Sequence, residues 1–173
     1  MNLPTWITVS RLLGAPLVLI LLLNPTPPRA WWAVGIFLVA ASTDWVDGYL
    51  ARRLDQVTDL GKFLDPLVDK LLVLAPLLAL VELNQVPAWG VFLILVRELA
   101  ISGWRVNPSF QAQSVPGANL WGKVKTVLQI IAVAFLLAPL PTAWQPLGLV
   151  LFWLSVVLTW VSGALYLWPR SAA

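Results

Sequence analysis

Residues 44–69 read DWVDGYLARRLDQVTDLGKFLDPLVD, and they hold six of the eight acidic residues in the chain. Read as an α-helix, with about 100° of rotation per residue, the first part of this stretch places two carboxylates and two small residues in one narrow arc. These four residues are Asp44, Asp47, Gly48 and Ala51. One helix face therefore combines negative charge with little side-chain bulk.

A second group of the same kind follows in the C-terminal part of the stretch. Gly61, Asp65 and Asp69 recur every four residues, which places them on one ridge of a second helix. The sequence thus predicts two neighbouring helices that each present a pair of acids.

The surroundings of this stretch are apolar. Of the 173 residues, 60% are hydrophobic and 11% are charged, with a mean hydropathy of +0.84, whereas soluble domains have about 25% charged residues. A membrane-spanning helix needs about 20 predominantly apolar residues. Six such runs occur, at about 4–23, 30–50, 64–82, 87–106, 120–139 and 145–168. We therefore predict an all-α, polytopic membrane protein with six transmembrane helices, forming a single domain over residues 1–173.

Lysine and arginine are concentrated at one set of helix ends. With six spans, both termini and the 51–63 and 107–119 connections share one side, which carries most of the bases, whereas the other side has only Arg29 near a span end. This bias predicts that the basic side is cytoplasmic. We expect an integral protein of the cell (inner) membrane, with its active site and both termini on the cytoplasmic side. The bases form no continuous stripe, so we expect no nucleic-acid partner.

The chain has no Cys and no His, which excludes thiol nucleophiles, histidine bases and the usual zinc sites. Carboxylates near the centre of a bilayer cost roughly 2.5–3.5 kcal/mol each, and the three bases of residues 44–69 are too few to balance them. Two divalent metals would supply the missing charge, and oxygen ligands favour Mg²⁺ or Mn²⁺. Paired metals of this kind serve phosphoryl transfer. The expected metal ligands are Asp44, Asp47, Asp65 and Asp69.

Small residues and a base complete this expected site. Gly48 and Ala51 leave room for a ligand to approach the backbone. Arg52, one turn beyond Gly48, can bind a phosphate in a bidentate manner. The stretch therefore favours a phosphate-bearing ligand held between carboxylate-bound metals and an arginine.

The spacing D-x2-D-G-x2-A-R-x8-G-x3-D-x3-D over residues 44–69 is similar at every position to the signature of the CDP-alcohol phosphatidyltransferase family. The resemblance implies a six-helix membrane fold, usually a homodimer, that transfers a phosphatidyl group from a CDP-linked lipid to an alcohol and releases CMP. It also implies that the four acids hold two metals and that Asp69 is the general base. Gly48, Arg52 and Thr58 are implied to contact the CDP group.

Three further segments, residues 2–11, 96–105 and 122–129, resemble the branch of this family that uses CDP-diacylglycerol and sn-glycerol 3-phosphate. With the signature, they give the expected CDP-lipid-binding set: Asn2, Thr8, Gly48, Ala51, Arg52, Thr58 and Gly61. Bases at the predicted cytoplasmic ends of two helices are expected to bind the acceptor phosphate: Arg97, Arg105, Lys123 and Lys125. Arg97 and Glu98 stand inside an apolar run, where ionisable residues usually face an interior site or pair with one another.

Other interpretations stay open at this point. A different acceptor would make the protein a cardiolipin synthase or an inositol-phosphate transferase of the same family. Intramembrane acids also mark ion pathways, so a divalent-cation transporter is the interpretation from another class, although the sequence has no evident inverted repeat. A purely structural membrane protein would not explain four costly carboxylates.

Overall fold

The computed structural model describes residues 3–53, 59–106 and 120–167, and the regular structure in them is entirely helical. The elements are α1 (Leu3–Leu22), α2 (Pro27–Arg53), α3 (Asp59–Glu82), α4 (Ala88–Val106), α6 (Leu120–Leu137), the short 3-10 helix η1 (Thr142–Trp144) and α7 (Gln145–Leu167). Each α-helix coincides with one of the six apolar runs, so the all-α prediction is confirmed for this part of the chain. Asn2 and Thr58 lie outside the described residues, and so do the side chains of residues 1–9, 44–66, 105–121 and 166–173.

The second and third helices are longer than the sequence predicts. Helix α2 begins at Pro27 and runs to Arg53, and α3 already begins at Asp59, so the predicted connection over residues 51–63 is too long. A proline is tolerated in the first turn of a helix, where its missing N–H has no intrahelical partner to lose. Arginine and alanine at the other end of α2 are good helix formers. All of the signature positions between 44 and 69 therefore lie on helices.

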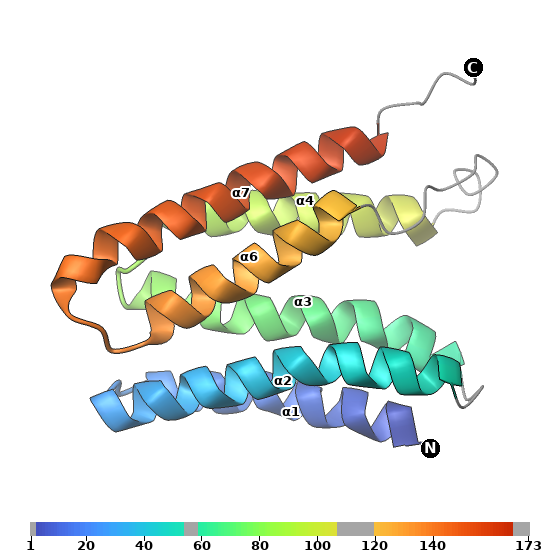
Figure 1. The fold of residues 1–173 in the computed structure, drawn as a ribbon, viewed down its shortest axis with the longest axis horizontal. Helices are drawn as coiled ribbons and strands as arrows, with labels where there is room; N and C mark the ends of the chain where they lie inside the picture. The colour runs from blue at the N-terminus through green and yellow to red at the C-terminus, as the bar shows by residue number, and fades with distance from the viewer. Residues whose placement is uncertain (1–2, 54–58, 107–119, 168–173) are drawn as a thin grey trace.

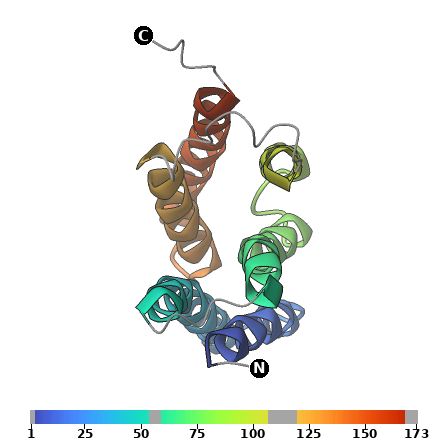
Figure 2. The same ribbon diagram turned by 90° about the vertical axis from the view of Figure 1, so that its right-hand side faces the viewer.

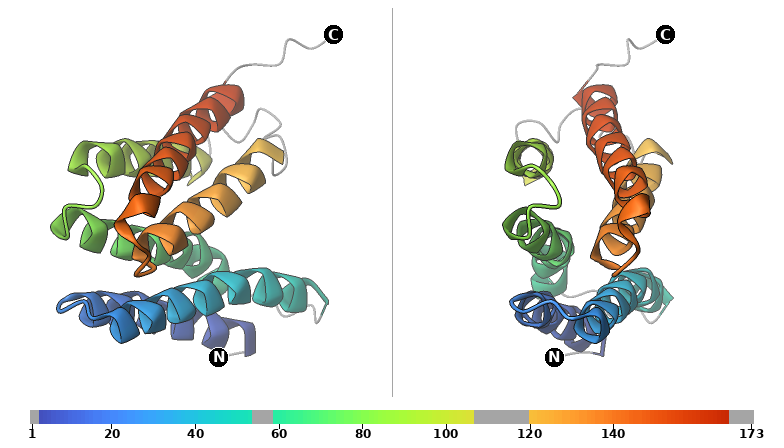
Figure 3. Two further views of the ribbon diagram at one scale, coloured as in Figure 1. Left: turned by 60° about the vertical axis from the view of Figure 1, so that its left-hand side comes forward. Right: turned by 90° about the vertical axis from the view of Figure 1, so that its left-hand side faces the viewer.

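The helices run up and down, and their ends fall into two groups. Figure 1 shows the N-terminus of α1, the C-terminus of α2 and the N-terminus of α3 at the same end of the molecule. The C-termini of α4 and α7 and the N-terminus of α6 lie at that end too. Helices α1, α3 and α4 form one column and α2, α6 and α7 form the other (Figures 2 and 3), joined by contacts of α1 with α2, α3 with α6 and α4 with α7. The sequence predicts that the start of the first helix and the end of the last helix lie on the same side as the helix ends next to the acid-rich stretch, and the helix ends in Figure 1 agree with this prediction.

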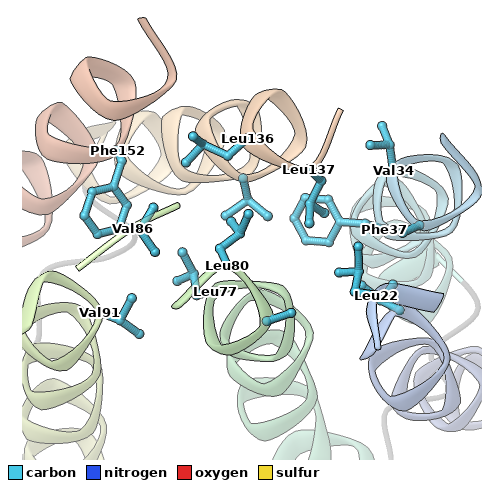
Figure 4. Close-up of a cluster of buried hydrophobic side chains, with 14 of the residues drawn as sticks. Leu22, Val34, Phe37, Leu77, Leu80, Val86, Val91, Leu136, Leu137 and Phe152 are labelled. Carbon is cyan, nitrogen blue, oxygen red and sulfur yellow. The ribbon is translucent and has the colours of Figure 1, made fainter. Parts of the chain in front are cut away.

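The apolar core lies mainly toward the other end. Figure 4 shows side chains of α1, α2, α3, α4, α6 and α7 converging there: Leu22, Val34, Phe37, Leu77, Leu80, Val86, Val91, Leu136, Leu137 and Phe152. Between α3 and α4 the chain turns through Asn84, whose φ of 56° lies in the left-handed region that asparagine tolerates better than most residues. This packing joins all six α-helices at the end away from residues 44–69.

Large apolar side chains are also exposed on each of the six α-helices, including Leu13, Trp32, Leu78, Phe92, Val127 and Val157. Apolar patches of this extent mark contact with a partner or a membrane. By length and composition, one stretch of the described residues, Thr142–Leu165, is apolar enough to cross a membrane, and Ser10–Leu22 is a shorter apolar helix. The helical fold is thus confirmed, whereas the number of spans stays a prediction.

Candidate active site

The two acidic pairs of the sequence lie on adjacent antiparallel helices. Asp44 and Asp47 are nine and six residues before the end of α2, and Asp65 and Asp69 are six and ten residues after the start of α3. At 1.5 Å per residue, both pairs lie about 9–15 Å from the shared end of the bundle. The two helices contact each other, so four carboxylate positions share one depth in the fold.

The backbone also bears out the expected helical phases. Residues 44–53 and 59–69 are continuous helix, so Gly48 and Ala51 share an arc with the acids of α2, and Gly61 shares a ridge with those of α3. The side chains of these residues and of Arg52 lie outside the described part of the structure, as does that of Thr8 on α1. Their contacts with a ligand therefore stay predictions.

Asp69 is the acid of this group whose side chain is described, and a buried arginine holds it. Arg11 of α1 donates from Nη1 to Asp69 Oδ1 at 2.8 Å. The side chain of Arg11 is only 1% exposed, whereas that of Asp69 is 44% exposed. The ion pair thus fixes one carboxylate oxygen against α1 while the group as a whole stays accessible.

The sequence reasoning missed Arg11 as a partner of this acid. It weighed only the bases of residues 44–69 as counter-charges for the acids, and Arg11 lies outside that stretch. The signal was present, because an arginine inside an apolar run usually faces an interior site. The pairing itself joins positions 58 residues apart, and no local pattern reports it.

A second charged cluster joins α4, α6 and α7. Glu98 Oε1 accepts hydrogen bonds from Arg97 Nη1 at 3.0 Å and from Lys125 Nζ at 2.5 Å. Arg97 Nη2 donates to Ser162 Oγ of α7 at 2.8 Å. The side chains of Arg97, Glu98 and Lys125 are 11%, 20% and 8% exposed. We call Arg97, Glu98, Lys125 and Ser162 the α4–α6–α7 cluster. Of the two arrangements expected for Arg97 and Glu98, an interior site or a mutual pair, the structure shows the pair.

Of the four expected acceptor-binding bases, the three whose side chains are described do not all lie together. Arg97 and Lys125 lie in the α4–α6–α7 cluster, whereas Lys123 is exposed, about 200° around α6 from Lys125. The side chain of Arg105 lies outside the described residues. Lys70 of α3 was not expected here, but its charge is close enough to repel that of Lys125. Since Lys70 directly follows Asp69, it links the acidic helix to this cluster.

The residues of the acidic pairs fit divalent metal ions. They offer carboxylate oxygens, which hard cations such as Mg²⁺ and Mn²⁺ prefer, and Asp69 keeps an accessible side chain. Among the described side chains, no group of three acids converges, because three of the four candidate ligands are outside that set. A pocket of about 260 Å³ lies at the opposite end, lined by Leu22, Ala30, Leu80, Leu137 and neighbouring residues. It has no charged lining residue and carries none of this chemistry.

Comparison with known proteins gives a consistent result. The family model described as CDP-alcohol phosphatidyltransferase matches residues 1–161. A Bacillus subtilis protein named CDP-diacylglycerol–glycerol-3-phosphate 3-phosphatidyltransferase is 43% identical, with 94% of this chain and 91% of the relative aligned. A protein of the same name from Pseudomonas fluorescens is 38% identical, with 98% of this chain and 92% of the relative aligned. Another from Rickettsia bellii is 32% identical, with 95% of this chain and 93% of the relative aligned. The similarity therefore extends over nearly the whole chain.

Proposed function

The chain belongs to the CDP-alcohol phosphatidyltransferase family, and from this premise we propose that it transfers the phosphatidyl group of CDP-diacylglycerol to sn-glycerol 3-phosphate, giving phosphatidylglycerophosphate and CMP. The relatives that are similar over more than nine tenths of the chain carry the name of this activity. The structural observation that carries the proposal is that two acidic helices and a buried basic cluster share one half of the bundle. A lipid diphosphate and a phosphorylated alcohol need this combination of groups.

In the proposed site, Asp44, Asp47, Asp65 and Asp69 hold two divalent metal ions, Mg²⁺ or Mn²⁺. When bound, such ions neutralise the diphosphate and stabilise charge on the attacking and leaving oxygens. The carboxylates of α2 and α3 supply the ligands from two sides, which suits a diphosphate lying between the helices. This assignment is supported by the matched depth of the four positions.

The CDP-lipid lies along the same two helices. Gly48, Ala51 and Gly61 leave space beside the backbone, and Arg52 binds a phosphate oxygen. Thr58, Asn2 and Thr8 complete the proposed CDP-lipid contacts from the connection after α2 and from the start of the chain. These residues hold the diphosphate so that its lipid-side phosphorus faces the acceptor.

The transfer is an in-line displacement at that phosphorus. The primary hydroxyl of the acceptor forms the new O–P bond, the bond from phosphorus to the CMP oxygen breaks, and CMP leaves. Asp69 accepts the hydroxyl proton, and Arg11 orients its carboxylate through the 2.8 Å contact. The accessible side chain of Asp69 is consistent with a base that must reach a bound substrate.

The acceptor phosphate is bound by the basic residues Arg97 and Lys125, with Arg105 and Lys123 nearer the helix ends. Lys70 adds a further positive charge beside Lys125. These buried charges suit the doubly charged phosphomonoester of glycerol 3-phosphate better than the singly charged phosphodiester of phosphatidylglycerol. This charge distribution therefore supports glycerol 3-phosphate over phosphatidylglycerol, the acceptor of a cardiolipin synthase.

The proposed setting is the cell (inner) membrane, with six spans and with the active site and both termini on the cytoplasmic side. The apolar exterior of all six α-helices supports this setting, and Figure 1 shows the N-terminus of α1 and the C-terminus of α7 at the same end of the bundle as the C-terminus of α2 and the N-terminus of α3. The soluble acceptor then arrives from the cytosol and the lipid donor from the leaflet. A homodimer is proposed from the family alone.

One experiment tests the reaction and its alternatives. Purified protein in lipid vesicles is given labelled CDP-diacylglycerol with glycerol 3-phosphate, inositol phosphate or phosphatidylglycerol in separate reactions. Release of CMP that depends on glycerol 3-phosphate supports the proposal, while preference for another acceptor overturns it. Uptake of Mn²⁺ into protein-containing vesicles, with no CMP formed from any acceptor, would instead favour a cation transporter.

A further inference from the structure

Arg97 is held from two sides by side chains of two different helices. Its Nη1 donates to Glu98 on its own helix at 3.0 Å, and its Nη2 donates to Ser162 Oγ of α7 at 2.8 Å. Ser162 in turn donates to the carbonyl oxygen of Thr159 at 3.0 Å. The hydroxyl is therefore oriented by its own helix so that its oxygen accepts from the guanidinium.

The next residue of α7 gives Arg97 the space it needs. A Cβ atom at Gly163 would lie 3.0 Å from Arg97 Nε and 3.3 Å from its Cγ. An alanine at this position would require Arg97 to shift by a few tenths of an ångström away from α7. Ser162 and Gly163 thus act together, because one binds the guanidinium and the other lets it approach.

The held arginine retains capacity for a further ligand. Within the described part of the structure, Arg97 Nε has no hydrogen-bond partner although it is buried. A guanidinium has five N–H donors in a rigid fork, so Glu98 and Ser162 use only part of its capacity. The two cations Arg97 and Lys125 exceed the single charge of Glu98, their shared partner, which leaves a positive site for an anion.

We propose that Ser162 is a positioning residue: its hydroxyl fixes Arg97 in the orientation in which the guanidinium binds the phosphate of the acceptor. The inference rests on the proposed function and extends it, because it makes α7 part of acceptor recognition. Ser162 and Gly163 lie just beyond residues 1–161, which the family model matches. The anion in question is the phosphate of sn-glycerol 3-phosphate, not the diphosphate of the lipid.

The variant Ser162→Ala tests the proposal, with Ser155→Ala as the matched control. Ser155 is also a buried serine of α7 that donates to a carbonyl three residues earlier, that of Phe152, at 2.7 Å. It makes no contact with Arg97 among the hydrogen bonds described. Both variants lose a buried hydroxyl, and Ser162→Ala also removes an acceptor of Arg97, so Ser162→Ala should lower the apparent Tm at least as much as Ser155→Ala.

The expected result is a selective change in acceptor kinetics. A hydrogen bond to a charged group is among the stronger ones, so the KM for glycerol 3-phosphate should rise roughly tenfold in Ser162→Ala, equivalent to about 1.4 kcal/mol. The KM for CDP-diacylglycerol should stay within about twofold of the wild type, and Ser155→Ala should change neither KM. A purely structural role of Ser162 would lower the apparent Tm without this division between the two substrates.

Gly163→Ala is the second variant, and it decides the question if Ser162→Ala does not fold. Gly163→Ala should raise the KM for glycerol 3-phosphate. The control Gly35→Ala on α2 should leave it unchanged, because an added Cβ at Gly35 meets no atom within 4 Å. If the wild type is active and neither α7 substitution changes the KM for glycerol 3-phosphate, the inference is wrong but the proposed function stands. A wild type that makes no product from glycerol 3-phosphate overturns the proposed function, and the inference with it.

Discussion

Replacing Glu98 by glutamine should destabilise the protein far more than replacing any exposed charge. Glu98 Oε1 forms ion pairs with both Arg97 and Lys125, and these cations are only 11% and 8% exposed. Glutamine keeps the size and one acceptor oxygen but removes the charge. Breaking a buried ion pair by removing one partner costs about 3–5 kcal/mol. Because the Glu98 side chain is 20% exposed, we expect a cost at the lower end of that range, about 3 kcal/mol.

The corresponding change in thermal stability is large enough to measure. For a chain of this size, each kcal/mol shifts the Tm by about 2–4 °C, so Glu98→Gln should lower the apparent Tm by roughly 6–12 °C. The double variant Glu98→Gln with Lys125→Met should recover at least half of that loss, because it removes the cation left without its counter-charge. Lys123→Gln, an exposed base on the same helix, should change the apparent Tm by less than about 2 °C.

Tryptophan fluorescence provides the assay. The chain has eleven Trp, so emission reports on unfolding of the whole bundle. Trp89 of α4 and Trp153 of α7, which lie 4.3 Å apart between ring centroids, are on two of the helices that the cluster joins. Unfolding is followed in one detergent at one scan rate for all variants. The reasoning is refuted if Glu98→Gln unfolds within about 2 °C of the wild type, or if adding Lys125→Met lowers the apparent Tm further.

Further predictions concern the acids and the metals. Asp69→Asn should reduce CMP release to background while labelled CDP-diacylglycerol still binds to the purified variant, and near-normal turnover would exclude Asp69 as the base. Arg11→Met should lower kcat at least tenfold with little change in either KM, because Asp69 loses its 2.8 Å anchor; an unchanged kcat would show that the anchor is dispensable. Excess EDTA should abolish turnover, and Mg²⁺ or Mn²⁺ should restore it, whereas activity that persists in chelator would contradict the two-metal proposal.

The helices and the acidic positions could be predicted from the sequence because both depend on local patterns. Apolar runs of about 20 residues define each helix, and the spacing from Asp44 to Asp69 fixes which residues share a face. The apolar run predicts a start of α2 at about residue 30, whereas the helix begins at Pro27 and includes Pro28. A proline in the interior of a helix kinks or ends it, whereas a proline in the first turn is well tolerated because its missing N–H would have no intrahelical partner there.

The inward face of each helix could not be predicted in the same way. In a chain surrounded by lipid, the outer face is as apolar as the interior, so periodicity does not distinguish them. Lys123 and Lys125 were therefore both assigned to the acceptor, although only Lys125 joins the cluster. The pairs Arg11 with Asp69 and Arg97 with Ser162 span 58 and 65 residues, and such contacts depend on tertiary packing alone.

The position of the apolar core has a consequence for motion. The side chains in Figure 4 join all six α-helices at the end away from the acids, so local opening of the bundle should cost the most free energy there. Because that end holds the six helices together, a lipid that entered between helices at the other end would leave this core intact.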